Sequence, residues 1–265
     1  MRLPVSAGAI RKLLKEIESS GGGEHVLAVG GARDLAPLLR QQFLRGRAEQ
    51  RAVRLGGPAG ADVYVHVLAG EDDVDVLRQA WRTRVPVVAV AHEPLTVPYV
   101  LATDVVRMRA GETLPLDDIA RAIAARLGED GAPLAARVPL LRQPMCEHLV
   151  ASFSRKNGLL AAAIWLPGAD LPVLALNELR LVSRLAQVYG AQSGRQLVPE
   201  LAATLGASFG LRAVARELLD LVPFGGWALK GTLAYAGTSA LGHAACKRFA
   251  LASTPPRAAA SLGAP

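Results

Sequence analysis

The sequence is poor in cysteine and in aromatic residues. Two cysteines among 265 residues cannot hold a fold together, which excludes a disulfide-built scaffold. Aromatic residues make up 5% of the chain, and basic residues are scattered, a pattern that argues against a nucleic-acid surface where bases stack on rings. Hydrophobic residues nevertheless reach 51% and mean hydropathy is +0.26, which excludes a disordered chain.

The sequence also lacks the common motifs of nucleotide-binding, hydrolytic and zinc sites. The chain has no GxxxxGK[ST] phosphate loop, no GxGxxG fingerprint, no GxSxG elbow and no HExxH zinc motif. The Cys/His pairs, Cys146 with His148 and His243 with Cys246, do not have the spacing of a known zinc site. These absences predict a protein that is not an enzyme, with no cofactor, no metal and no catalytic residue.

Charge divides the chain into two halves. Residues 1–130 carry 17 basic and 17 acidic side chains, whereas residues 131–265 carry 13 and 6. The whole surplus of +7 therefore lies in the C-terminal half, which also holds the longest apolar runs. Basic and apolar character together indicate contact with an anionic membrane surface.

An α/β region is predicted for residues 24–130, after an N-terminal helix and Gly-rich connector in residues 1–23. Val-rich runs alternate with amphipathic segments, which predicts a mostly parallel sheet covered on both faces. The expected strands are 25–30, 51–55, 61–69, 86–91 and 103–108, and the expected helices are 34–45, 73–84 and 115–127.

An all-α region is predicted for residues 146–252, because the strand pattern ends there. Residues 131–145 contain three prolines and are expected to form a linker, and residues 253–265 a disordered tail. Helices are expected over 148–163, 173–189, 199–222 and 227–250, with Gly190 ending the second. Apolar helix ends run into Pro-Gly turns, which predicts a bundle of helical hairpins.

The middle of the α/β region resembles Era-like GTPases. The strand expected at 61–69, a helix and the strand at 86–91 are similar to the last strands of that fold. The guanine-reading Asn-Lys-x-Asp motif is replaced by Ala91-His92-Glu93-Pro94. The resemblance implies a G-domain-like sandwich without a phosphate loop, which has lost its nucleotide chemistry.

A Gly-Gly turn follows the first expected strand, where α/β proteins often bind phosphate at a helix N-terminus. The turn reads Gly30-Gly31-Ala32-Arg33-Asp34. A tight connection between strand and helix explains the turn as well, and the functional alternative is a candidate anion site formed by Gly30, Gly31 and Arg33.

Four stretches of the C-terminal half resemble the YcjF-like domain of unknown function, which accompanies bacterial Era-type GTPases and is called membrane-associated. They are 166–172 (LPGADLP), 177–190 (NELRLVSRLAQVYG), 217–227 (ELLDLVPFGGW) and 236–242 (AGTSALG). The resemblance implies membrane association but carries no activity and no catalytic residues.

Two groups of residues in this half are candidates for helix packing and for contact with a membrane or an acidic partner. Turn and small residues are expected to pack helices or enter the membrane: Leu166, Pro167, Gly168, Gly206, Gly210, Pro223, Gly225, Gly226, Trp227 and Gly242. Arginines at helical spacing are expected to form a basic face toward lipid head groups or an acidic partner: Arg180, Arg184, Arg212 and Arg216.

The sequence as a whole predicts a non-enzymatic, membrane-associated pseudo-GTPase scaffold or adaptor. It would self-associate or partner a true GTPase, and would meet the membrane at its surface or through inserted hairpins. The expected location is the cytoplasmic side of the inner membrane, or the cytoplasm with peripheral attachment. The alternative is a soluble α/β binding protein that holds a small anionic or nucleotide ligand between Gly30 and Asp34.

Overall fold

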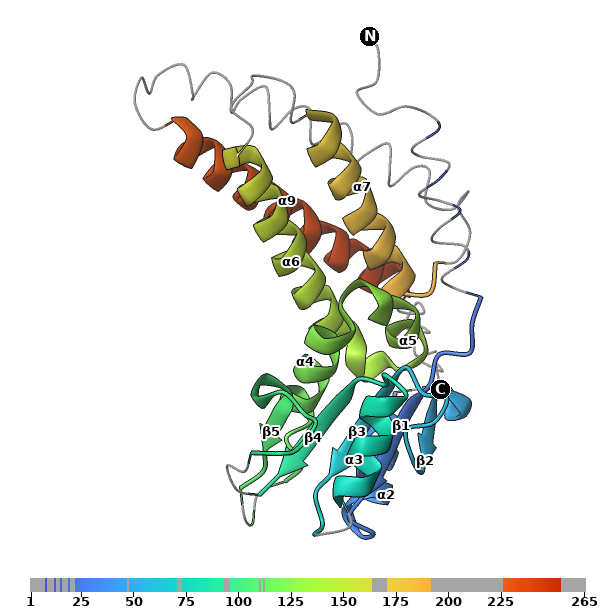
Figure 1. The fold of residues 1–265 in the computed structure, drawn as a ribbon. Helices are drawn as coiled ribbons and strands as arrows, with labels where there is room; N and C mark the ends of the chain where they lie inside the picture. Colours follow the sequence, from blue (N-terminus) through green and yellow to red (C-terminus); the bar gives the residue numbers. More distant parts are fainter. Residues whose placement is uncertain are drawn as a thin grey trace, which may run out of the picture.

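The computed structural model describes residues 22–163, 171–191 and 226–253, apart from 47, 71–72, 93–95, 110 and 112, together with the single positions 8, 12, 15 and 19. Figure 1 shows an α/β body from which the long helices α6 (Arg142–Ala163), α7 (Leu171–Val188) and α9 (Gly226–Ser253) extend. The expected N-terminal helix is described at those four single positions, and each of them is helical.

The body is built on a five-stranded sheet in which every pairing is parallel. Its order, β2-β1-β3-β4-β5, is that of flavodoxin-type doubly wound sheets. The prediction of a parallel sheet is confirmed, and each strand lies within two residues of its expected bounds. The strands are β1 (Leu27–Gly31), β2 (Val53–Leu55), β3 (Val63–Val67), β4 (Val87–Ala91) and β5 (Val105–Arg107).

Helices cover both faces of this sheet. The side chains of Val63, Val65 and Val67 lie in one apolar cluster with α2 (Leu35–Phe43) and α4 (Leu116–Leu127). The intervening Tyr64 packs on the opposite face, with Leu77 and Ala80 of α3 (Asp73–Arg82). Strand side chains alternate between the two faces, so a near-continuous apolar run is what a sheet covered on both sides requires.

The segment 131–145, expected to be a linker, is helical and packed in the structure, so this prediction was wrong. This segment forms α5 (Ala132–Arg137), the 3₁₀ turn η4 (Pro139–Leu141) and the start of α6, and its apolar side chains are buried. Pro133 and Pro139 each stand in a first turn, where a missing N–H costs nothing, so they begin helices instead of breaking them.

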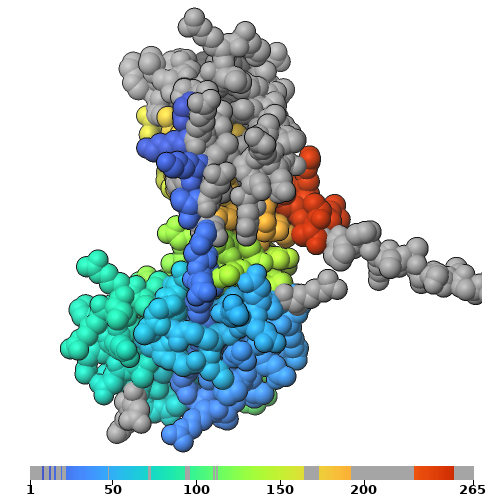
Figure 2. Space-filling view, turned by 90° about the vertical axis from the view of Figure 1, so that its right-hand side faces the viewer, coloured from blue at the N-terminus to red at the C-terminus, as the bar shows by residue number. Residues whose placement is uncertain are grey.

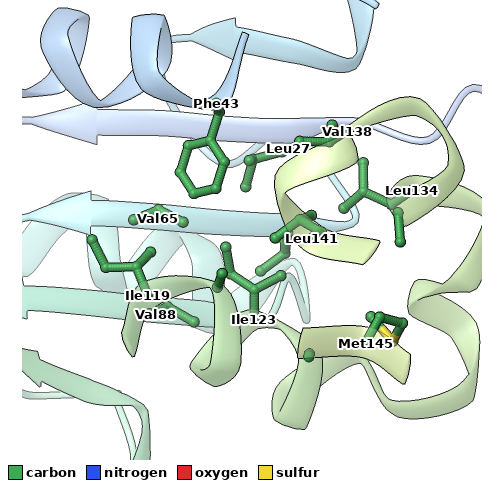
Figure 3. Close-up of a cluster of buried hydrophobic side chains, with 14 of the residues drawn as sticks. Leu27, Phe43, Val65, Val88, Ile119, Ile123, Leu134, Val138, Leu141 and Met145 are labelled. Atoms are coloured by element: carbon green, nitrogen blue, oxygen red, sulfur yellow. The ribbon is translucent and has the colours of Figure 1, made fainter. Parts of the chain in front are cut away.

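This segment joins the body to the long helices. Figure 3 shows Leu134, Val138 and Leu141 pointing toward Leu27 of the sheet and Ile123 of α4. In Figure 2 its yellow-green atoms lie between the blue and cyan body and the orange α7. Sheet and helices therefore share one apolar core across the region where the sequence suggested a domain boundary.

In the described part of the C-terminal half, the second layer is formed by α6, α7 and α9. Gly190 ends α7 as expected, with φ +88°, while Ala191 N–H donates to the Ala186 carbonyl at 3.1 Å. Asn157 is fully buried and connects all three helices: its amide donates to Thr238 Oγ1 and its oxygen accepts from Asn177, each at 3.0 Å.

An arginine occupies a position that favours glycine at the end of α3. Arg84 has φ +57°, its N–H donates to Trp81 O, and Val85 N–H donates to Ala80 O, which together form a Schellman turn. We expect Arg84→Gly to raise the free energy of unfolding by about 1 kcal/mol, because only glycine adopts this φ without steric cost. Urea unfolding followed by circular dichroism measures the change.

The matched control is Arg82→Gly, in the last turn of the same helix. It also removes an exposed arginine, but from a residue with helical backbone angles, and should lower stability by about 1 kcal/mol. A loss of stability in both variants would contradict the assignment of strain to Arg84.

Candidate functional site

The carboxyl edge of the sheet is where parallel α/β proteins bind their ligands. Strand order reverses between β1 and β3, and doubly wound proteins bind their ligands at that switch point. The residues that follow β1 and β3 there are Ala32 and Arg33 on one side, and Leu68, Ala69 and Gly70 on the other.

Packing within the chain accounts for both glycines of the candidate anion site. A Cβ on Gly30 would collide with the Tyr64 hydroxyl and lie 2.8 Å from the Gly56 carbonyl oxygen. Gly31 has φ +99°, and a Cβ there would overlap the Val67 backbone. The next N–H, of Ala32, donates to Val67 O at 2.9 Å, so it is used inside the fold and not directed at a ligand.

Arg33 is the one exposed side chain of the three candidates. It stands before α2, and Asp34 makes no side-chain hydrogen bond to the first turn of that helix. An anion at this place would therefore depend on Arg33 and on the N–H groups that begin α2.

A buried polar network lies directly beneath this edge. The Tyr64 hydroxyl and His66 Nδ1 are 2.8 Å apart, and His66 Nε2 and Asp73 Oδ1 are also 2.8 Å apart. Asp73 Oδ2 accepts from the N–H groups of Ala69 and Gly70, at 2.7 and 2.9 Å. Tyr64 is 1% exposed, His66 2% and Asp73 8%, so the network is shielded from solvent.

With a neutral His66 ring, the network has one consistent assignment of protons. Burial disfavours the Asp73 carboxylate, but hydrogen bonds from Gly70, Ala69 and His66 outweigh it and hold the pKa of Asp73 below its ordinary value. His66 Nε2–H then donates to the carboxylate, so Nδ1 accepts from the Tyr64 hydroxyl. Burial, with the Asp73 charge, raises the pKa of Tyr64 to about 12.

A Tyr–His–Asp chain has the orienting part of a catalytic triad, but the hydrogen bonds found here join groups inside the fold. The phenol that His66 would activate holds its proton tightly, and it is packed against Gly30 rather than open to a substrate. The Asp73 carboxylate closes the loop between β3 and α3. The network was not predicted from the sequence, where its signal was a tyrosine and a histidine two residues apart in an apolar strand.

The basic face predicted from arginine spacing is not found at its two described members. Arg180 Nε is 2.7 Å from Glu129 Oε2, and the same carboxylate pairs with Lys156 at 3.1 Å, which links the helices to the body. Arg184 is 2% exposed and donates to Gln187 at 3.0 Å. Helical spacing placed both arginines on one side of α7, but Arg184 is buried there, whereas Arg180 is 37% exposed and its guanidinium pairs with Glu129. Arg212 and Arg216 lie outside the described residues.

Among the small residues predicted to pack helices, Gly242 of α9 faces α6 and α7. A Cβ there would lie 2.6 Å from Val150 and 3.3 Å from Leu181. Gly226 begins α9, and Trp227 follows it in the first turn. The others lie outside the described residues: Leu166, Pro167, Gly168, Gly206, Gly210, Pro223 and Gly225.

A pocket of about 240 Å³ lies at the opposite, amino edge of the sheet. Trp81 and Tyr99 line it, with ring centroids 5.8 Å apart, and Trp81 is 62% exposed. Asp104 and Arg126 complete one wall as an ion pair at 3.4 Å. The sequence did not predict this pocket, because its residues come from α3, the start of β4 and the turn before it, the β4–β5 connection and α4.

Comparison with known proteins finds no matching family model, no matching curated protein and no matching solved structure. The resemblances to Era-like GTPases and to the YcjF-like domain therefore stay predictions from the residues quoted above. Within the described ranges no three His, Cys, Asp or Glu side chains gather as metal ligands. No helix in those ranges has both the length and the apolarity to cross a bilayer.

Proposed function

We propose that the protein is a non-enzymatic scaffold that works at a membrane surface, with a G-domain-like body that binds no nucleotide. The proposal depends on one observation: atoms of the chain itself pack against the Gly-Gly turn at the point where strand order reverses. Gly30 is packed against Tyr64, Gly31 against Val67, and the polar groups beneath them satisfy one another. A body with this edge is suited to hold partners on its surface rather than a nucleotide within it.

The core shared by sheet and helices supports a scaffold. Apolar side chains of α6 and α7 belong to the same cluster as those of the strands, and Glu129 adds ion pairs across the junction. A partner on the body and a surface on the helices would thus be held at a fixed separation. The partner we propose is a true GTPase or a second copy of the chain.

Charge supports the membrane part of the proposal. The surplus of basic over acidic residues lies wholly in residues 131–265. Arg180 and Arg184 are engaged within the fold, so contact with anionic lipid would depend on other basic residues, among them Arg212 and Arg216. The attachment we propose is peripheral, at the cytoplasmic side of the inner membrane.

Two measurements on the full chain test this proposal. Calorimetry with GTP or ATP and Mg²⁺ should show no binding at micromolar concentrations. Flotation with phosphatidylglycerol-containing vesicles should recover the protein, and Arg212→Glu with Arg216→Glu should weaken recovery more than the same charge change at exposed Arg51 and Arg82. Micromolar nucleotide affinity, or no flotation of the parent protein, would overturn it.

The same calorimetry addresses a soluble protein that holds an anion at residues 30–34. That function would show as binding of nucleotide or inorganic phosphate that Arg33→Ala abolishes. Since Arg33 is exposed, its loss should leave stability within about 0.5 kcal/mol of the parent, so any loss of binding would be attributable to the site.

A further inference from the structure

The packing of α6 against α9 determines which residues meet. Gly158 and Gly231 face each other so closely that a Cβ on Gly231 would lie 3.0 Å from the Gly158 carbonyl oxygen. Further along, Gly242 faces Val150. Numbers fall on α6 as they rise on α9, so the two helices run antiparallel, and their backbones approach closely where glycine stands.

One helical turn beyond the Val150–Gly242 contact lie Cys146 on α6 and Cys246 on α9. Because side chains four residues apart share a helix face, the register brings these two residues together. Cys146 lies in the buried apolar cluster, Cys246 packs against that cluster, and each thiol shifts the pKa of the other. They are the chain's two cysteines, they stand 100 positions apart in the sequence, and both are free thiols.

The surroundings of the pair favour a reaction between its members. Cys146 is 4% exposed, whereas Cys246 is half-buried and gives a small oxidant access. The Tyr189 hydroxyl lies 3.8 Å from Cys146 Sγ. The neighbouring Cys246 thiol, with help from the Tyr189 hydroxyl, lowers the pKa of Cys146 against the effect of burial, which favours the reactive thiolate at Cys146.

We propose that Cys146 and Cys246 are an oxidation site at which a peroxide forms an intramolecular disulfide between α6 and α9. The Cys146 thiolate attacks one peroxide oxygen and the O–O bond breaks, which leaves Cys146 as a sulfenic acid; the departing hydroxide takes up the proton that the Cys146 thiol lost and leaves as one water. The Cys246 sulfur then attacks the sulfenic sulfur, its proton leaves with the departing hydroxyl as a second water, and the S–S bond forms. Both thiols are oxidised and the peroxide is reduced to two waters.

The consequence of this bond is a lock on the helical layer. The disulfide would close a loop that contains all of α7, and would constrain the unfolded chain across about 100 residues. It would join α6 and α9 at the end that packs against the body, where Tyr189 and Phe249 also meet with ring centroids 6.4 Å apart. This inference does not depend on the proposed scaffold function.

The test uses the reduced full-length protein treated with hydrogen peroxide, then unfolded and labelled with a maleimide polymer. We expect two labels before treatment, none after, and two again after dithiothreitol. Non-reducing electrophoresis should show a monomer of increased mobility, and the intact mass should fall by two hydrogen atoms. The Tm of the oxidised protein should rise on the order of 10 °C.

Cys246→Ser is the control, because its half-buried position tolerates a hydroxyl better than that of Cys146. It should form no monomeric disulfide, and peroxide should leave its Tm unchanged. Two labels after treatment of the parent protein, a thiol loss that dithiothreitol does not reverse, or a disulfide-linked dimer in place of the monomer would each overturn the proposal.

Discussion

Gly31→Ala is expected to destabilise the α/β body by about 4 kcal/mol, enough to unfold much of a marginally stable protein. Gly31 combines φ +99° with a neighbouring backbone: a Cβ would overlap the carbonyl of Val67, the residue paired with it across the sheet. Neither the Gly31 backbone nor the Val67 carbonyl can move away without breaking the pairing of β1 with β3. Chemical denaturation of the purified variant measures the loss.

The control for this variant is Gly57→Ala. A Cβ on Gly57 would meet no neighbouring atom within 4 Å, and Gly57 does not have positive φ, so the same change should alter stability by less than about 0.5 kcal/mol. If Gly31→Ala folds with parent stability, Gly31 is not held by packing, and a ligand becomes the better explanation for the Gly-Gly turn.

Asp73→Ala is expected to cost about 3 kcal/mol. The change leaves the N–H groups of Ala69 and Gly70 without their acceptor and removes the partner of His66 inside the fold. Asp75→Ala on the same helix is the control: Asp75 is 82% exposed and pairs with Arg78, so its loss should cost less than about 0.5 kcal/mol. Urea unfolding of both variants makes the comparison, and equal losses would show that the buried network contributes nothing.

The pH dependence of stability distinguishes the contribution of the Asp73 negative charge from that of the side chain's size and shape. The folded protein holds the pKa of Asp73 below the value of about 3.9 in an unfolded chain, so the carboxylate stabilises the fold above that pH. This contribution is lost as pH falls through the lower, folded pKa. Asp73→Asn should therefore lose less stability than the parent between pH 5 and pH 2.

Local patterns were sufficient for the secondary structure of the body. Valine-rich runs and amphipathic segments located all five strands and the helices between them to within two residues. These signals are short-range: alternation of side chains along a strand, helical periodicity and turn residues depend on neighbours in the chain. The cap at Gly190 was predictable for the same reason.

The predictions from the sequence were wrong where one local pattern is compatible with two different tertiary structures. Pro133 and Pro139 are compatible with a linker or with first turns of short helices, and burial of Leu134, Val138 and Leu141 against the sheet decided for helices. Arg184 has the spacing of an exposed stripe, yet α7 turns that side inward. Charge and proline were therefore poor guides to exposure in this segment of the chain.

The amino-acid sequence was enough to establish the parallel α/β class, the neutral and basic halves, and the lack of nucleotide-binding motifs. Only tertiary structure decided that Gly30 and Gly31 serve packing, that Tyr64, His66 and Asp73 form one buried network, and that Cys146 meets Cys246. The physical reason is separation along the chain. Backbone preferences and periodicity act over a few residues, whereas these contacts depend on strand register and on the approach of helices from distant segments.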